Sequence, residues 1–434
     1  SDTIGCKARE GVADGLTLND NAVPGETRID KFTGKTTSLV KIIGADDNYS
    51  GKYKTEPQNF MKLKGRKSLF TLLQETWNVF FNDSDGDPIY RNTHPVEGNT
   101  QTDGLAQITN KFKSSLDYMA NYYLDFEQPL KEIDQKILEL EGDSSSHKEE
   151  LSLLTSERDD CLKKIFSNLT RWQKVQLARH PQRPLSMDYI TSLSPNFIEL
   201  HGDRYFGDDS AIVCGLGSID DVKVVFLGQQ KGKNTKENIY RNFGMMRPEG
   251  YRKALRVMKL AEKFKLPIIS LIDTPAAYPG IGAEESGLVE AIANILFEMS
   301  CLRVPTISIV IGEGASGGAL AIGLTDKILC MENTWYSVIS PEGCASILYR
   351  DSTMSEKAAE SMKVTSIDLY EMGIADEIIK EPIGGAHRNL KESAKNLKES
   401  IVNNISNLNK IEKDVLIEQR KFKYDKIGSW TESE

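Results

Sequence analysis

The sequence predicts an α/β fold, because buried strands and amphipathic helices alternate from Pro184 onward. The strands are short runs rich in Val, Ile and Leu, whereas the helices carry apolar residues at spacings of three and four. The strands are expected at residues 211–216, 222–227, 266–272, 306–311 and 327–331, and the helices at residues 248–264 and 284–299. Pairs of strands followed by a helix indicate a sheet with helices packed outside it.

The composition is that of an ordinary globular protein. Of the 434 residues, 39 % are hydrophobic and 27 % are charged, which is enough apolar content for a sizeable core. The formal net charge of −9 argues against general nucleic-acid binding. The longest apolar stretch, residues 304–331, contains Glu313 and several glycines, so no membrane span is expected. The six cysteines show no C-x-x-C pattern, which favours a reducing compartment and predicts no zinc site.

Four segments can be separated along the chain. Residues 1–118 are rich in Gly, Asn, Asp and Thr with little periodicity, so a largely irregular N-terminal extension is expected. Its one apolar stretch, residues 69–81, is expected to form a short helix. Residues 119–184 show apolar stripes at helical spacing, broken near Gly142, and predict a helical hairpin. The α/β core follows over residues 185–389, and a C-terminal helical segment covers residues 390–434.

A basic stretch interrupts this acidic chain at residues 231–253. It contains Lys231, Arg241 and Arg247, which we interpret as candidates for binding an anionic substrate group such as a phosphate or carboxylate. A solvated basic face is the alternative. Ala276 and Tyr278 follow the strand expected at residues 266–272, at the edge of a sheet where ligands of α/β proteins tend to bind.

The glycine-rich stretch at residues 312–318 lies between an apolar strand and a small-residue helix that is expected to start near Ala319. Backbone N–H groups at such a junction have no internal partner and favour negative charge. One interpretation is an oxyanion hole made by the N–H groups of Gly317 and Gly318, with Gly314 and Ala315 beside the substrate. The alternative is a turn without a binding role, which only lets the helix and the strand pack closely.

Two other functions, dinucleotide binding and nucleophilic hydrolysis, fit the same residues. Residues 312–317 match the dinucleotide fingerprint G-x-G-x-x-G, with Glu332 placed as a ribose-binding acid. Residues 314–318 match the nucleophile elbow G-x-S-x-G around Ser316, and Asp376 and His387 follow in hydrolase order. Three histidines, His180, His201 and His387, are expected in or near the core, and none has the spacing of a metal site.

Several longer motifs resemble the carboxyltransferase α subunit of multi-subunit acetyl-CoA carboxylase. They are LDFEQPL (124–130), LARHPQRP (177–184), ELHGDR (199–204), TKENIYRNFGM (235–245), PEGYRKALR (248–256), YSVISPEGCASIL (336–348) and EPIGGAHRN (381–389). The resemblance keeps its order from about Leu124 to Trp430 and leaves the N-terminal extension unexplained.

The resemblance implies a crotonase-like (ClpP/crotonase) superhelix of repeated ββα units. It also implies transfer of a carboxyl group from carboxybiotin, on a carrier protein and not bound covalently to this chain, to acetyl-CoA, giving malonyl-CoA. Gly317 and Gly318 would hold the ureido oxygen of biotin. In this family the site lies between an α and a β subunit, and the β subunit carries a zinc ribbon.

Further partners implied are the biotin carboxyl carrier protein and biotin carboxylase, in an α2β2 arrangement in bacterial cytoplasm or plastid stroma. The sequence departs from the family pattern at four places. Ala276 and Ala315 stand where glycine is usual, Ser286 replaces a basic residue, and Leu288-Val289 replaces a Gln-Ser pair.

Overall fold

The computed structural model describes residues 6–8, 22–29, 36–42, 122–141 and 148–428. The chain divides into two compact units, residues 1–120 and residues 121–434, and the break lies close to the boundary expected near residue 118. None of the helices in the described ranges is both long and apolar enough to cross a membrane.

The first unit contains a small antiparallel sheet, in the order β1-β3-β2. Its strands are β1 (Cys6–Ala8), β2 (Ala22–Ile29) and β3 (Thr36–Ile42). These three segments form strands where no regular element was expected, and the remainder of residues 1–118 lies outside the described residues. The sequence of β3, TTSLVKI, is rich in β-branched residues, and strand pairing satisfies its backbone groups. The helix expected at residues 69–81 lies outside the described residues.

The second unit is built on a mixed sheet in the order β11-β9-β8-β7-β6-β5-β4. Its strands are β4 (Ile198–Glu199), β5 (Ile212–Ile219), β6 (Val222–Gln229), β7 (Ile268–Thr274), β8 (Thr306–Ala315), β9 (Lys327–Met331) and β11 (Glu377–Ile379). Strands β6 to β11 run parallel, whereas β4, β5 and β6 pair antiparallel. A short strand, β10 (Trp335–Ser337), pairs in parallel with the end of β8. The predicted α/β class is confirmed.

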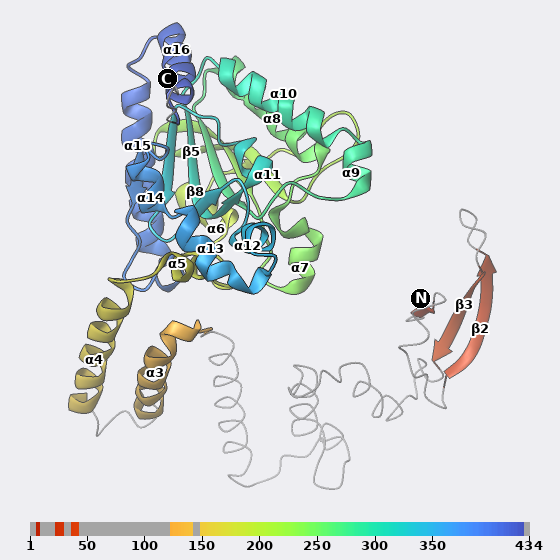
Figure 1. The fold of residues 1–434 in the computed structure, drawn as a ribbon. Helices are drawn as coiled ribbons and strands as arrows, with labels where there is room; N and C mark the ends of the chain where they lie inside the picture. Colours follow the sequence, from red (N-terminus) through yellow and green to blue (C-terminus); the bar gives the residue numbers. More distant parts are fainter. Residues whose placement is uncertain (1–5, 9–21, 30–35, 43–121, 142–147, 429–434) are drawn as a thin grey trace, which may run out of the picture. The chain divides into compact units, whose positions relative to one another are not determined.

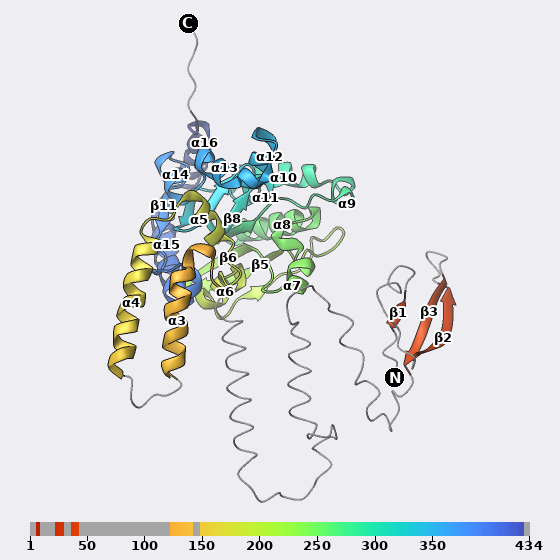
Figure 2. The same ribbon diagram turned by 60° about the horizontal axis from the view of Figure 1, so that its bottom comes forward.

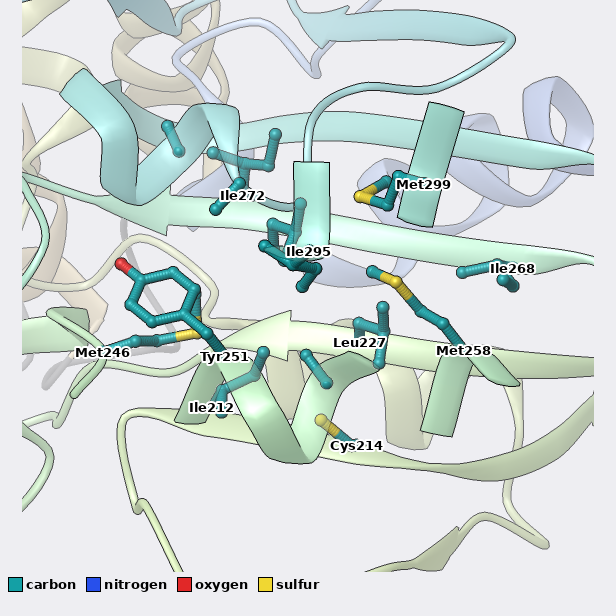
Figure 3. Close-up of a cluster of buried hydrophobic side chains, with 14 of the residues drawn as sticks. Ile212, Cys214, Leu227, Met246, Tyr251, Met258, Ile268, Ile272, Ile295 and Met299 are labelled. Carbon is teal, nitrogen blue, oxygen red and sulfur yellow. The ribbon is translucent and has the colours of Figure 1, made fainter. Parts of the chain in front are cut away.

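Helices cover both faces of this sheet (Figure 1). On β6, Val225 and Leu227 face a cluster formed with α8 (Pro248–Phe264) and α10 (Leu288–Cys301). Val224 and Phe226 face the opposite cluster, formed with α6 (Ser186–Leu193) and α15 (Leu390–Leu408). The alternation follows from the two-residue period of a strand. Figure 3 shows the first cluster, in which Tyr251, Met258 and Ile295 close over the sheet.

The predicted helix at residues 248–264 is confirmed at both ends. Pro248 stands in the first turn of α8, where its missing N–H costs nothing, and Lys265 caps the helix in the left-handed conformation with φ of 58°.

The other long helices are α3 (Gln128–Glu141), α4 (Lys148–Phe166) and α16 (Lys413–Asp425). The shorter ones are η5 (Asp125–Glu127), α5 (Arg171–Ala178), α7 (Thr235–Tyr240), η6 (Asn242–Gly244), α9 (Ile281–Glu285), α11 (Ser316–Leu320), α12 (Pro341–Leu348), η7 (Ser352–Met354), α13 (Ser355–Met362), α14 (Ser366–Glu371) and η8 (Ala386–Arg388).

Helices α3 and α4 occupy the region where a helical hairpin was predicted. They contact each other and lie side by side in Figures 1 and 2. Leu130, Ile133 and Ile137 of the predicted stripe are buried, and its fourth member, Leu140, is half-buried. Residues 142–147, between the two helices, lie outside the described residues.

The C-terminal helices are part of the core rather than an appendage. Leu397 and Ile401 of α15 and Leu416 of α16 are buried in the cluster under the sheet. Arg420 of α16 is 1 % exposed and forms a two-point ion pair with Asp326, with both contacts at 2.8 Å. Its remaining N–H groups donate to three backbone carbonyls, those of Met299, Leu302 and Val304. All five donors of this guanidinium therefore have acceptors.

Candidate functional site

Strand β8 continues through most of the predicted glycine turn. It runs to Ala315, so Gly312 and Gly314 are strand residues. A Cβ at Gly312 would lie 2.4 Å from Asp273 Oδ1, and one at Gly314 would lie 2.7 Å from Cδ2 of Tyr336. These glycines allow close packing of neighbouring side chains. The dinucleotide interpretation is wrong, because its first glycines must form the turn after the strand.

The junction itself is formed by Ser316, Gly317 and Gly318, the first residues of α11. Ser316 is exposed and left-handed, with φ of 60°. Gly317 is half-buried, and a Cβ there would meet nothing nearer than Cδ1 of Ile292 at 3.8 Å. Since the first turn of a helix lacks internal acceptors, the N–H groups of Gly317 and Gly318 have no hydrogen-bond acceptor within the described residues. The two donors thus lack a protein partner, and they lie beside the exposed Ser316, with Gly317 half-buried and Gly318 buried.

Gly318 packs directly against the backbone that follows β7. A Cβ at Gly318 would lie 2.4 Å from the carbonyl carbon of Ala276 and 2.6 Å from the nitrogen of Ala277. The Ala276 carbonyl is itself fixed, because it accepts a 2.7 Å hydrogen bond from Thr274 Oγ1. Only glycine permits this approach.

The hydrolase triad is not assembled. Asp376 accepts from the N–H of Ile328, 2.8 Å away at the amino-terminal end of β9, whereas Ser316 follows the carboxyl-terminal end of β8. His387 stacks on His180 with ring centroids 3.9 Å apart. No described side chain forms a hydrogen bond with the Ser316 hydroxyl, and Asp376 and His387 are engaged elsewhere, so the nucleophile-elbow interpretation is wrong.

The histidine expectation holds for two of the three residues. His180 is buried and His387 is half-buried, as predicted for residues near the core, but the His201 side chain is 63 % exposed and pairs with Asp208 on a surface loop. No group of three or more His, Cys, Asp and Glu side chains suited to a metal ion occurs in the described part of the chain.

A buried charge cluster underlies the junction. Lys231 Nζ lies 2.7 Å from Asp273 Oδ1 and 2.6 Å from Glu313 Oε1, while Arg179 Nε lies 2.7 Å from Glu313 Oε2. Burial alone would raise the pKa of Glu313, but Lys231 and Arg179 outweigh it and hold that pKa below its usual value. Burial raises the pKa of Asp273 in spite of Lys231. Lys231, predicted to bind substrate, is therefore engaged with two carboxylates.

The other two predicted cations differ in availability. Arg241 donates from Nη1 to the carbonyl of Ser210 at 2.9 Å. Arg247 is exposed, and its guanidinium lies over the Tyr278 ring, 4.4 Å from the centroid. Its side chain makes no hydrogen bond or ion pair with the residues that the structure describes. Arg247 and Tyr278, predicted separately, are thus brought together as a preorganised cation.

Two predicted binding residues face the interior. The methyl group of Ala315 is buried in a cluster with Val175 and Trp335, and Gly314 is covered by Tyr336. Sequence reasoning missed Gln229 and Arg179, both of which contact the junction or the charge cluster below it. Arg179 lies inside the LARHPQRP motif, which could have drawn attention to it, whereas Gln229 carries no sequence signal.

Comparisons with known proteins decide the family. Residues 123–428 match the family model described as acetyl co-enzyme A carboxylase carboxyltransferase-like. The chain is 51 % identical over 316 residues to the acetyl-coenzyme A carboxylase carboxyl transferase subunit alpha of Geobacter metallireducens, covering 72 % of this chain and 99 % of the relative. It is 52 % identical over 313 residues to the Staphylococcus saprophyticus subunit of the same name, covering 71 % of this chain and all of the relative. The chain belongs to this family.

The family assignment covers the second unit and leaves residues 1–122 unmatched. Residues 123–428 have the predicted α/β architecture, built on one mixed sheet. Two ββα units are visible in it, β5 and β6 before α8, and β9 and β10 before α12. The predicted family is confirmed, and the oxidoreductase and hydrolase alternatives find no support.

Solved structures show weaker likeness. A transcarboxylase 12S structure is 18 % identical, covers 50 % of this chain and 43 % of its own, and gives a TM-score of 0.40. A Pseudomonas malonate decarboxylase hetero-tetramer structure is 15 % identical, with coverages of 51 % and 87 % and a TM-score of 0.43. The assignment rests on the family match and the relatives alone.

Proposed function

We propose that this chain is the α subunit of an acetyl-CoA carboxyltransferase that transfers a carboxyl group from carboxybiotin, carried on a partner protein, to acetyl-CoA to give malonyl-CoA. Membership of the family supports the reaction class. The observation that carries the proposal is the pair of unpartnered N–H groups at Gly317, which is half-buried, and Gly318, which is buried next to it beside the exposed Ser316.

The chemistry needs donors where negative charge develops. When biotin gives up its carboxyl group, charge accumulates on the ureido oxygen, and the N–H groups of Gly317 and Gly318 hold that oxygen. A preorganised donor of this kind lowers a barrier by about 3 kcal/mol, because it pays no reorganisation cost during the reaction. No side-chain base is required, since the biotin anion can accept the proton of acetyl-CoA. This fits a junction where no base reaches Ser316.

Arg247 supplies the positive charge toward the substrate. Its guanidinium is held over Tyr278 and lacks a carboxylate partner among the described residues, so it can bind an anionic group of the substrate. Lys231 instead neutralises the carboxylates below the junction, and Arg241 ties two loops together. The three predicted cations thus divide into one binding residue and two supporting residues.

A partner subunit covers the surface beside the junction. Ile281 of α9 is 77 % exposed, Val289 of α10 is 75 % exposed and Leu320 of α11 is 41 % exposed. Large apolar side chains gathered on adjoining elements favour a protein interface. We assign this face to the β subunit with its zinc ribbon, in an α2β2 assembly that also works with the biotin carrier and biotin carboxylase. Such a complex would operate in bacterial cytoplasm or plastid stroma.

The test is reconstitution with a bacterial β subunit and a biotinylated carrier, followed by measurement of malonyl-CoA. The chain alone is expected to form no product, and the complex is expected to be active. Arg247→Met should raise the KM for acetyl-CoA or the carrier about tenfold, whereas Lys236→Met, an exposed cation of the same stretch, should leave both within about twofold. Product from the chain alone, or equal behaviour of the two variants, would contradict the assignment.

A further inference from the structure

Gln229 links the two segments that form the junction. It is the last residue of β6, and its side chain is fully buried. Its Nε2 donates to the carbonyl of Gly318 at 2.7 Å, and its Oε1 accepts from the N–H of Asp273 at 3.2 Å. One amide therefore connects the start of α11 to the end of β7.

The chemistry of both contacts requires an amide. The Gly318 carbonyl can only accept and the Asp273 N–H can only donate, so the orientation of the Gln229 amide is fixed by its partners. An apolar side chain of the same size would leave a buried acceptor and a buried donor unpaired, which is the costly way to lose a hydrogen bond.

These contacts determine where Gly318 sits. On one side, the Ala276 backbone presses against the Gly318 Cα and would meet a Cβ at 2.4 Å. On the other side, the Gln229 side-chain amide donates a hydrogen bond to the Gly318 carbonyl. Removal of the second constraint frees the peptide group between Gly318 and Ala319 to rotate. The Gly318 Cα can then shift, and the N–H donor that it carries shifts with it.

We infer that Gln229 is a positioning residue, whose side-chain amide aims the N–H groups of Gly317 and Gly318 at the substrate oxygen. This inference rests on the proposed function of that pair. Gln229 touches no substrate itself, so its loss should lower kcat and leave the KM values and the affinity for the β subunit nearly unchanged. Oxyanion donors act on the transition state rather than on binding.

The first experiment compares Gln229→Met with wild type in the reconstituted complex. We expect kcat to fall by roughly tenfold to a hundredfold, short of the full loss of a donor, with KM within about twofold. Ser186→Ala is the matched control, because Ser186 Oγ donates to the Gln229 backbone carbonyl at 2.6 Å and is equally buried. That variant should keep kcat within about twofold of wild type.

The second experiment uses Gln229→Glu as a conditional replacement. A protonated carboxyl group has one donor and one acceptor, as the amide does, whereas the carboxylate only accepts. Burial favours the neutral form of the carboxyl group introduced at position 229. The charged groups near it are Asp273, Glu313, Lys231 and Arg183. The kcat of this variant, relative to wild type at each pH, should therefore rise as the pH is lowered from 9 to 6, on the scale of about tenfold.

The outcomes are separable. If the wild-type complex makes no malonyl-CoA, the proposed function fails before Gln229 is considered. If wild type is active while both Gln229 variants match it at every pH, the inference is overturned and the function stands. Loss of the folded circular-dichroism spectrum in both variants, or an equal drop in Ser186→Ala, would show a role in folding alone and would overturn it as well.

Discussion

Replacing each glycine of the junction by alanine should separate packing from chemistry. In Gly318→Ala the new Cβ would lie 2.4 Å from the Ala276 carbonyl carbon, about 1 Å inside the shortest ordinary contact of 3.4 Å. Because the obstacle is backbone held by Thr274, it cannot rotate away. Overpacking of this kind costs about 1–3 kcal/mol of unfolding free energy.

Gly317→Ala is the matched comparison. Its Cβ would meet only Ile292, at 3.8 Å, and its φ lies outside the left-handed range, so no strain is introduced. Loss of chain entropy in the unfolded state should stabilise this variant by about 0.4–1 kcal/mol. The two variants should therefore differ by roughly 1.4–4 kcal/mol in unfolding free energy, with Gly318→Ala the less stable protein.

The assay is urea unfolding followed by circular dichroism, with turnover measured separately in the reconstituted complex. Gly318→Ala should also lose on the order of a hundredfold in kcat, because its N–H group is displaced together with the Cα. Equal unfolding free energies for the two variants would refute the close approach to Ala276. Full turnover by a destabilised Gly318→Ala would refute the role of its N–H group.

Three further outcomes are expected. Ser316→Ala should keep most of the turnover, since the proposed donors are backbone groups; a dead variant with a normal circular-dichroism spectrum would revive nucleophilic catalysis. Arg420→Met should lower the unfolding free energy by about 3–5 kcal/mol, the cost of breaking a buried ion pair, while Arg303→Met, which removes an exposed pair, should leave the urea midpoint unchanged. Burial lowers the pKa of His180 to about 4 and that of His387 to about 2, so the unfolded chain binds protons that the folded chain does not, and stability should fall as pH drops from 6.5 to 4. His387→Phe keeps a stacked ring, and its thermal midpoint should depend less on pH across that range; an unchanged pH dependence would contradict the assignment.

Local signals in the sequence were enough for the elements of the core. The helix at residues 248–264 has proline in its first turn and one apolar face, and the strand at residues 327–331 is a short apolar run, so both were located to the residue. The N-terminal strands were missed, because β2 and β3 lie among polar residues that suggested irregular structure. Their stabilisation comes from pairing with each other, which no single window displays.

The site depended on contacts between distant residues. Glycines at positions 312 and 314 suggested a turn. Both lie in strand β8, where the lack of a side chain makes room for Asp273 and Tyr336. Lys231 looked like a free cation, because its partner Glu313 is 82 residues away along the chain. Gln229 gave no signal at all, since its function is to satisfy two backbone groups that only the folded chain brings near it.

The ion pair between Arg420 and Asp326 can form only late in the synthesis of the chain. The two residues are 94 positions apart, so a ribosome that adds roughly 5–20 residues per second finishes Arg420 about 5–20 seconds after Asp326. During that interval the carboxylate at the start of β9 has no counter-ion, and three carbonyls near the end of α10 and the start of β8 lack a donor. The ends of α10, β8 and β9 therefore gain these partners only after α16 has been synthesised.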